Sequence, residues 1–251
     1  MTVVITTGNN PKAMWPGVNA WFGKRYDQYA VQWTDLFDQD TSDKSYEEVV
    51  ESVGFGLAVV KSQGGTIHYD SDQQGATFRF THVAFALGFM VTIEEMRDNQ
   101  YADVAKRRAP DLAFSMRQTK EIVAANVYNR AFDGTNYPTG DGAALGSTTH
   151  PSLVGSQSNI LATAADLSEA SLEDLIIQIN QAKDSRGRVI MMKPQTLHIP
   201  PQLEFEAFRI LKSVQQNDTA NNATNALKGT GALPGGCKVN QFFTDPDAWF
   251  I

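Results

Sequence analysis

The stretch from residue 79 to residue 132 changes character along its length, and this change constrains the fold more than any other feature. Up to Val91 it is apolar, aromatic and β-branched ("RFTHVAFALGFMV"), which favours a strand. From Thr92 onward it consists of about forty residues of strong helix formers without one glycine. A chain of 251 residues that runs a long strand directly into a long helix needs other surfaces to bury both elements.

The expected helix covers residues 92–132. Thr92 is a suitable N-cap, and Glu94 and Glu95 lie in the first turn, where the helix dipole favours carboxylates. Pro110 interrupts the pattern, so it should kink the helix or divide it into two pieces. With both halves helical, the element would span ~60 Å.

A long hairpin is expected before this helix. Residues 53–60 ("VGFGLAVV") are strand-like, and the polar, glycine-rich stretch after them is typical of a hairpin tip. Residues 77–89 ("TFRFTHVAFALGF") then return as a second strand with a period of two. Because a hairpin of this length is marginal alone, we expect it to lie along another surface.

The first 45 residues are rich in aromatic side chains but lack a clean helical or strand period. Trp15, Trp21 and Trp33 are the largest of these side chains. Rings in a segment with little core of its own must be buried against the rest of the chain or against a neighbouring subunit. The alternative is an ordinary first helix near residues 20–37 that packs on its own domain.

The second half of the chain has α/β character. Residues 171–183 predict a helix in which Ser171 and Asp174 have capping-box spacing. Residues 188–193 ("RVIMMK") predict a buried strand, and residues 197–211 predict a short strand, a Pro-Pro stop and an amphipathic helix. The final residues from Cys237 are again strand-like.

Composition excludes several classes of protein. The formal net charge of −7 argues against a protein whose main function is to grip phosphates. The single cysteine, Cys237, cannot form an intrachain disulfide, so the chain suits a reducing compartment. The longest apolar run, residues 83–91, is far shorter than the ~20 residues of a membrane helix, so no membrane partner is expected.

Motifs that would carry chemistry are weak. The start of a calcium-binding loop is suggested by the spacing of Asp70, Asp72 and Gly75. Thr81, however, occupies the twelfth position, where such a loop has a glutamate ligand. A polar hairpin tip therefore explains these residues better. The histidines lack metal-ligand spacing, and we expect neither a metal nor a cofactor. The basic cluster at residues 106–110 ("KRRAP") favours a solvated or intersubunit salt-bridging face over a nucleic-acid patch.

The order of elements resembles that of the major capsid proteins of tailed bacteriophages, which share the Hong Kong ninety-seven type fold. The resemblance rests on four features: the N-terminal arm, the hairpin, the long helix that directly follows the hairpin, and the sequence "LHIPPQLEFEAFRIL" at residues 197–211. The resemblance implies an α+β capsid fold. In it, residues 1–52 form an N-terminal arm, 53–91 the extended-loop hairpin, 92–132 the spine helix of the peripheral domain and 133–251 the axial domain. Members of this family usually return to the peripheral domain after the axial domain, but this sequence ends at "DAWFI" in a strand-like pattern, so we expect either that it is truncated there or that the fold is completed differently.

The resemblance also implies a function and partners. The subunit would be a structural protein, not an enzyme, that self-assembles into pentamers and hexamers of an icosahedral head around double-stranded DNA. It would assemble in the host cytoplasm, reside in the virion and touch the packaged DNA only weakly. A separate scaffold, a portal and decoration proteins would be its further partners.

The residues expected at intersubunit interfaces lie in the hairpin tip, in the N-terminal arm or on the charged face of the long helix. They are Trp15, Trp21, Trp33, Lys61, Gln63, His68, Asp70, Asp72, Glu94, Glu95, Arg97, Lys106, Arg107 and Arg108. Each has a simpler alternative, as an exposed tip residue, a core aromatic or a solvated charge.

Two other functions remain open. An α+β enzyme would have a cleft lined by loops 133–165 and 214–236, with Asp141 and His150 as its acid–base pair. A non-viral nanocompartment shell would share the capsid fold. A neighbouring cargo enzyme would favour the nanocompartment, and a portal and terminase would favour the phage head.

Overall fold

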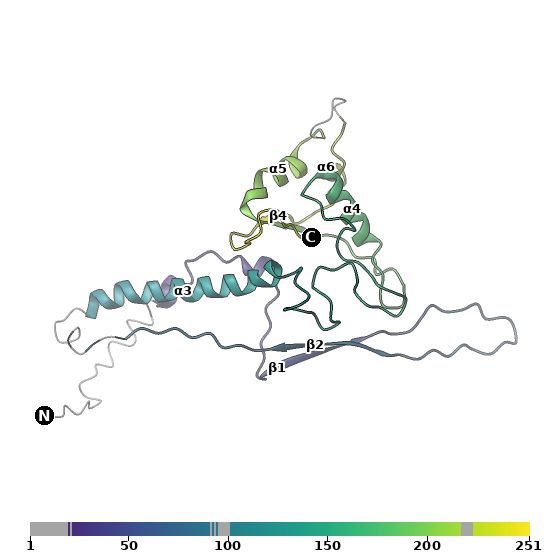
Figure 1. Cartoon of the computed structure of the whole chain (residues 1–251), viewed down its shortest axis with the longest axis horizontal. Coiled ribbons are helices and arrows are strands. Elements are labelled where there is room, and N and C mark those ends of the chain that lie inside the picture. Colours follow the sequence, from purple (N-terminus) through teal and green to yellow (C-terminus); the bar gives the residue numbers. More distant parts are fainter. Residues whose placement is uncertain (1–19, 21, 91, 93, 95–100, 217–222) are drawn as a thin grey trace. The chain divides into compact units, whose positions relative to one another are not determined.

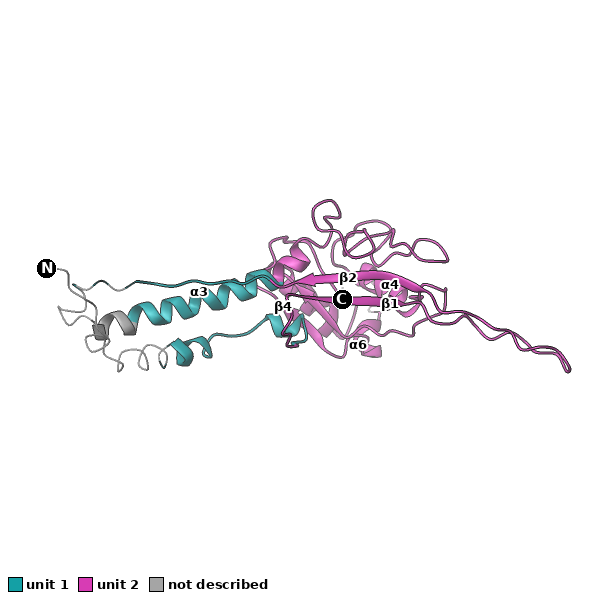
Figure 2. Ribbon diagram, turned by 90° about the horizontal axis from the view of Figure 1, so that it is seen from below, with its two compact units in different colours: residues 1–39, 83–124 teal, residues 40–82, 125–251 magenta. Residues whose placement is uncertain are grey.

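The structure is a computed structural model that describes residues 20, 22–90, 92, 94, 101–216 and 223–251, with the backbone alone for residues 101–106. The chain divides into two compact units (Figure 2). Unit 1 comprises residues 1–39 and 83–124, and unit 2 comprises residues 40–82 and 125–251. Helices and strands occur together, which agrees with the expected α+β class.

Helix α3 (Tyr101–Asn129) is the longest element (Figure 1). It continues through Pro110, so the expected division into two pieces does not occur. The expected start at Thr92 lies next to residues outside the described part, although Glu94 is assigned as helical. Ala109 and Ala113, four residues apart on one face of α3, are fully buried.

In unit 1, the segment before residue 39 packs on α3 through its aromatic rings. Residues 22–26 are helical, and η1 (Trp33–Asp35) is a short 3-10 helix. The guanidinium of Arg117 lies 4.7 Å from the centre of the Tyr26 ring, and the rings of Tyr29 and Phe114 are 5.0 Å apart. The arm therefore buries part of its aromatic surface against its own chain.

In unit 2, β1 (Tyr46–Ser52) and β2 (Gln74–Thr81) form an antiparallel ladder. This confirms a hairpin but corrects its strands, because residues 53–60 and the residues after Thr81 are not in a ladder. The register shifts between Val50 and Ser52, and Gly54 adopts a left-handed backbone with φ of +68°. A bulge followed by such a glycine bends the strand and ends regular pairing.

The body of unit 2 contains α4 (Glu169–Asn180), β3 (Thr196–Ile199), α5 (Glu204–Lys212), α6 (Ala226–Thr230) and β4 (Gly236–Val239). The 3-10 turn η2 (Pro201–Leu203) joins β3 to α5, as the Pro-Pro stop predicts. Strands β3 and β4 are parallel, and the backbone of Phe250 pairs antiparallel with His198 on the other edge of β3. These elements surround one apolar core, which includes Leu167, Leu172, Leu197, Ile199, Ala207, Ile210, Leu227 and Leu233.

Two expectations for this body are corrected. Helix α4 begins one turn earlier than expected, because Ser168 is the N-cap and Ser171 is the third helical residue of its capping box. Residues 188–193 are not a buried strand. Met191 is 83% exposed and has a left-handed φ of +57°, and the segment makes only one isolated bridge, between Val189 and Lys183. An apolar run becomes a strand only where a partner strand lies beside it.

The C-terminal end of α3 belongs to unit 2 and packs against residues 242–250. The ring centres of Tyr128 and Phe250 are 5.0 Å apart, and those of Phe132 and Phe250 are 5.9 Å apart. The Asn129 side chain donates to the carbonyl of Phe242 and accepts the N–H of Thr244. The strand-like end of the sequence is thus divided between β4 and the Phe250 bridge.

Candidate functional site

The hairpin tip, defined here as residues 53–73, carries several exposed large apolar side chains. It projects beyond the rest of this unit in both ribbon views (Figures 1 and 2). Leu57 is 79% exposed, Val60 99% and Tyr69 85%. Soluble monomers rarely leave contiguous apolar surface of this kind uncovered, so the tip is a candidate for contact with another molecule.

Two aspartates hold the two halves of the tip together in place of a backbone ladder. The N–H of Gly56 donates to Asp70 Oδ2 at 2.7 Å, and the N–H of Gly54 donates to Asp72 Oδ1 at 2.7 Å. The hydroxyl of Ser52 also donates to Asp72. Side-chain oxygens therefore occupy the positions that carbonyls would take in a regular hairpin.

The turn at residues 184–188 grips the base of the tip. Arg186 donates from Nη1 to Asp70 Oδ2 at 2.9 Å and from Nη2 to the carbonyl of Ser71 at 2.6 Å. Arg188 donates to the carbonyl of Phe55 at 2.5 Å. Because arginine offers several donors in a fixed plane, each of these side chains can bridge the turn and the hairpin.

The turn is itself held by Asp184. Its carboxylate accepts the N–H groups of Arg186 and Arg188, and the Arg188 Nε at 2.6 Å. On the hairpin side, the hydroxyl of Ser185 donates to Glu51 at 2.5 Å. These contacts, with those of Arg186 and Arg188, form what we call the hairpin clamp.

The electrostatics of the clamp favour ionised carboxylates. The pKa of Asp70 is lowered chiefly by the N–H groups of Gly56 and Ser71 and also by Arg186. The pKa of Asp72 is lowered by the Ser52 hydroxyl and the Gly54 N–H. Both carboxylates are therefore charged at neutral pH; Asp70 binds the Arg186 guanidinium of the turn, and Asp72 binds groups of the hairpin itself.

In unit 1, Glu121 is the most deeply buried carboxylate among the described residues, at 3% exposure. Its oxygens accept the backbone N–H groups of Gln32 and Trp33 at the start of η1. The ammonium of Lys120 lies 3.9 Å from the centre of the Trp33 ring. This arrangement fixes the arm to α3 with a charge-assisted bond and a cation–π contact.

The structure brings together Asp141 and His150, the pair named for a possible enzyme. His150 Nδ1 lies 2.7 Å from Asp141 Oδ2. Burial acts to raise the pKa of Asp141, but hydrogen bonds from Thr139, His150 and Ala143 outweigh it and lower the pKa to about 2. His150 Nε2 is buried without a hydrogen-bond partner, so the ring is enclosed within its loop. The geometry is that of a loop staple.

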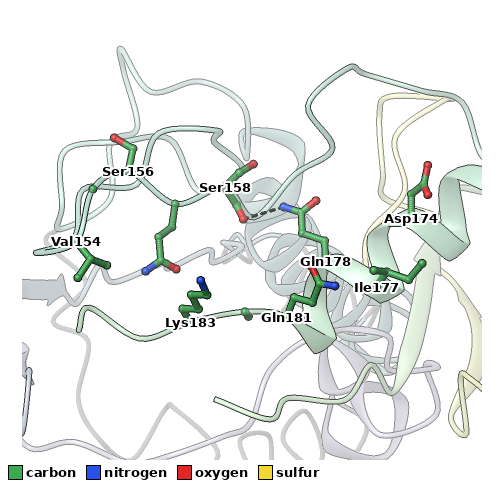
Figure 3. Close-up of a pocket in the computed structure, with 11 residues that line it drawn as sticks. Val154, Ser156, Ser158, Asp174, Ile177, Gln178, Gln181 and Lys183 are labelled. Carbon is green, nitrogen blue, oxygen red and sulfur yellow. Dashed lines mark hydrogen bonds between the residues drawn. The ribbon is translucent and has the colours of Figure 1, made fainter. Parts of the chain in front are cut away.

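A hollow of about 560 Å³ lies between residues 154–158 and the end of α4 (Figure 3). Its lining is largely polar, with the amides of Gln157, Gln178 and Gln181 among it. Neither Asp141 nor His150 lines it. Gln178 donates to the carbonyls of Ser158 and Ile160, which links α4 to this loop.

Among the expected interface residues, those of the tip are exposed. Lys61, Gln63 and His68 have exposed side chains, whereas Asp70 and Asp72 are engaged within the chain by the contacts above. No group of three or more potential metal-binding side chains occurs in the part of the chain that the structure describes. The tip thus combines exposed apolar side chains with a polar segment that includes Lys61 and Gln63.

The other expected interface residues are distributed differently. Trp33 is buried against its own α3, which favours the core-aromatic alternative for this residue. Glu94 and Arg107 are exposed, and Arg108 donates to the carbonyl of Met90 at 3.1 Å. Trp15, Trp21, Glu95 and Arg97 lie outside the described residues, as does the side chain of Lys106.

Sequence reasoning missed Arg186, Arg188 and Glu121. The sequence "DSRGR" at residues 184–188 does signal a turn with an acidic start, but its partner carboxylates lie more than a hundred residues away. No local sequence pattern marks Glu121, because its role is to accept the backbone N–H groups of Gln32 and Trp33, which are nearly ninety residues away.

Among the described helices, none is both long and apolar enough to cross a membrane.

Comparison with known proteins gives a consistent result. The model of the family described as phage capsid protein matches residues 75–251, which is well over half of the chain. A solved capsid of bacteriophage JBD30, decorated with minor capsid protein trimers, has a TM-score of 0.58 at 12% identity and covers 90% of this chain and 98% of that one. The JBD30 procapsid has a TM-score of 0.57 at 12% identity and covers 95% and 100%. No curated protein matches the chain.

The family match and the structural matches all point to a capsid protein, and an exposed apolar hairpin suits a protein that contacts other molecules. The likeness to the JBD30 chains shows a shared fold, and the family match covers the helix, the α/β body and β2. The chain belongs to the phage capsid protein family and is a structural protein of the phage head, located in the capsid of the virion.

Proposed function

We propose that this chain is the repeating subunit of an icosahedral head, in which it self-assembles into pentamers and hexamers around double-stranded DNA. The single observation that carries the proposal is the hairpin tip, whose apolar side chains are exposed while its base is clamped. A neighbour that covers these side chains would gain the free energy of burying apolar surface, about 25 cal/mol per Å². The surface is thus suited to contact between subunits.

In this proposal, the elements take the roles that the capsid fold assigns to them. The arm, the hairpin, α3 and residues 133–251 act as N-terminal arm, extended loop, spine helix and axial domain, respectively. The formal net charge of −7 is compatible with a container that holds packaged DNA only weakly. The JBD30 capsid is decorated with minor capsid protein trimers, and a comparable decoration protein, a scaffold and a portal are proposed partners here.

The test is assembly of the purified full chain, followed by negative-stain electron microscopy and sedimentation. Closed shells or capsomer-sized rings are the expected result, alone or with a candidate scaffold. A Leu57→Asp, Tyr69→Asp double variant should remain as free subunits, because two charges replace apolar contacts at the tip. The matched control is Asp174→Asn on the exposed face of α4, which should assemble normally. A wild-type chain that stays monomeric at micromolar concentration with a scaffold present would contradict the proposal.

A further inference from the structure

Two stretches of the chain repeat one pattern. Residues 53–59 are VGFGLAV and residues 83–89 are VAFALGF. In both, valine, phenylalanine and leucine occupy the first, third and fifth positions, and only glycine or alanine stands between them. This alternation is typical of a strand with one apolar face. The small residues on the opposite face allow another backbone to approach closely.

Most of each stretch is uncovered in the isolated chain, although Val53 at the start of the first is buried. Phe55 and Leu57 are 58% and 79% exposed, and Phe85 and Leu87 are 53% and 58% exposed. Two apolar faces with the same spacing therefore stand open, one in each unit. Exposed apolar surface of this regularity marks a site of contact with another protein.

The backbone of the second stretch is also open, as is that of the first from Leu57 onward, whereas the backbone groups of Val53, Gly54, Phe55 and Gly56 are bonded within the chain. No backbone hydrogen bond joins residues 57–60 or residues 83–89 to any other described residue. An extended segment with unpaired N–H and C=O groups is a template for pairing with another strand. The interaction that both stretches lack is therefore a strand partner.

The β1–β2 ladder separates the two stretches along the chain. They leave opposite ends of the ladder, since Ser52 pairs with Gln74 at one end and Tyr46 pairs with Thr81 at the other. Tyr46 and Ser52 are six residue steps apart along β1, a distance of about 20 Å. Residues 83–89 would have to reverse along the whole ladder to reach residues 57–60.

We propose that residues 57–60 of one copy of this chain pair as a β-strand with residues 83–89 of a second copy. This inference rests on the proposed function, because it names the strands through which neighbouring subunits hold one another. Leu57 would then share one face of the new ladder with Phe85 and Leu87 of the other copy. Because two different segments pair, the contact is heterologous and can propagate around a closed ring.

Disulfide trapping tests the pairing. In a Cys237→Ala background, chains carrying Leu57→Cys are assembled together with chains carrying either Phe85→Cys or Leu87→Cys, and the particles are then oxidised. Opposed residues in a ladder lie at the Cα separation that a disulfide requires. We expect covalent dimers of unlike chains to be at least about tenfold more abundant than in the control. In the control, Ala58→Cys replaces Leu57→Cys and directs the thiol to the opposite face.

A second measurement uses the unmodified chain. Hydrogen exchange is followed in free subunits and in assembled particles, and the amides of residues 57–60 and 83–89 should exchange at least about tenfold more slowly after assembly. Particles in which these amides stay fast, or in which Leu57→Cys forms no more dimer than Ala58→Cys, would overturn the pairing while leaving the proposed function intact. A wild-type chain that forms no particles would instead overturn the proposed function.

Discussion

The carboxylate of Glu121 lies 2.9 Å from the backbone nitrogen of Trp33 and accepts its hydrogen bond in a buried position. The same carboxylate accepts the N–H of Gln32, so it satisfies the free donors at the start of η1 as an N-cap would. A residue of α3 thereby fixes the arm, which has little core of its own. The position of Trp33 therefore depends on a single acidic side chain nearly ninety residues away.

We expect Glu121→Ala to lower the free energy of unfolding by about 1–3 kcal/mol, because it leaves two backbone donors unpaired. Glu121→Gln should cost less, since the amide oxygen can still accept one bond. Urea unfolding followed by tryptophan fluorescence measures both. Glu173→Gln on α4, where no hydrogen bond is involved, is the matched control and should stay within about 0.5 kcal/mol of the wild type. Equal stabilities for Glu121→Ala and the control would contradict the capping role.

Removal of Arg186 should free the hairpin without unfolding the body. Arg186→Ala loses the contacts to Asp70 and Ser71, so amides of residues 53–73 should exchange faster, on the order of tenfold. The core around Leu197 should exchange as in the wild type. Arg209→Ala removes an arginine that pairs with Glu206 on the exposed face of α5, and it should leave the hairpin unchanged. Equal exchange in both variants would show that the clamp does not hold the tip.

Acid should weaken the loop that Asp141 staples. Its pKa in the folded chain, about 2, lies below its ordinary value of 3.8, so the unfolded chain binds more protons between these values. The stability that Asp141 contributes is therefore present above about pH 4 and is lost as the pH falls towards 2. Denaturant midpoints measured across this range should fall more steeply for the wild type than for Asp141→Asn. Parallel slopes in the two proteins would count against the staple.

The core and the tip should respond in opposite ways to the same substitution. Leu197 is fully buried in β3, so Leu197→Ala should destabilise the subunit by about 2–5 kcal/mol. Leu57 is 79% exposed, so Leu57→Ala should change subunit stability by less than about 0.5 kcal/mol yet reduce the yield of assembled particles. Unfolding and sedimentation of the two variants separate these effects. A Leu57→Ala subunit that is destabilised but assembles normally would place Leu57 in a core.

The sequence determined the elements whose stability is local. Helix α3 follows from a long run of helix formers, and the Thr196–Lys212 strand–turn–helix follows from its Pro-Pro stop and amphipathic spacing. The sequence also predicted a hairpin with a polar tip, but it placed the first strand at residues 53–60, whereas β1 is Tyr46–Ser52. In each case, the signal lies within a short window of the chain.

Only the tertiary structure decided which apolar runs become strands and which charges act. The runs at residues 53–60, 83–89 and 188–193 have strand composition but no partner strand among the described residues, so they remain outside any ladder there. Arg186 and Glu121 act on carboxylates and amides about ninety to more than a hundred residues distant. Pairing and ion contact depend on what lies beside a residue in space, whereas composition and periodicity record only what lies beside it along the chain.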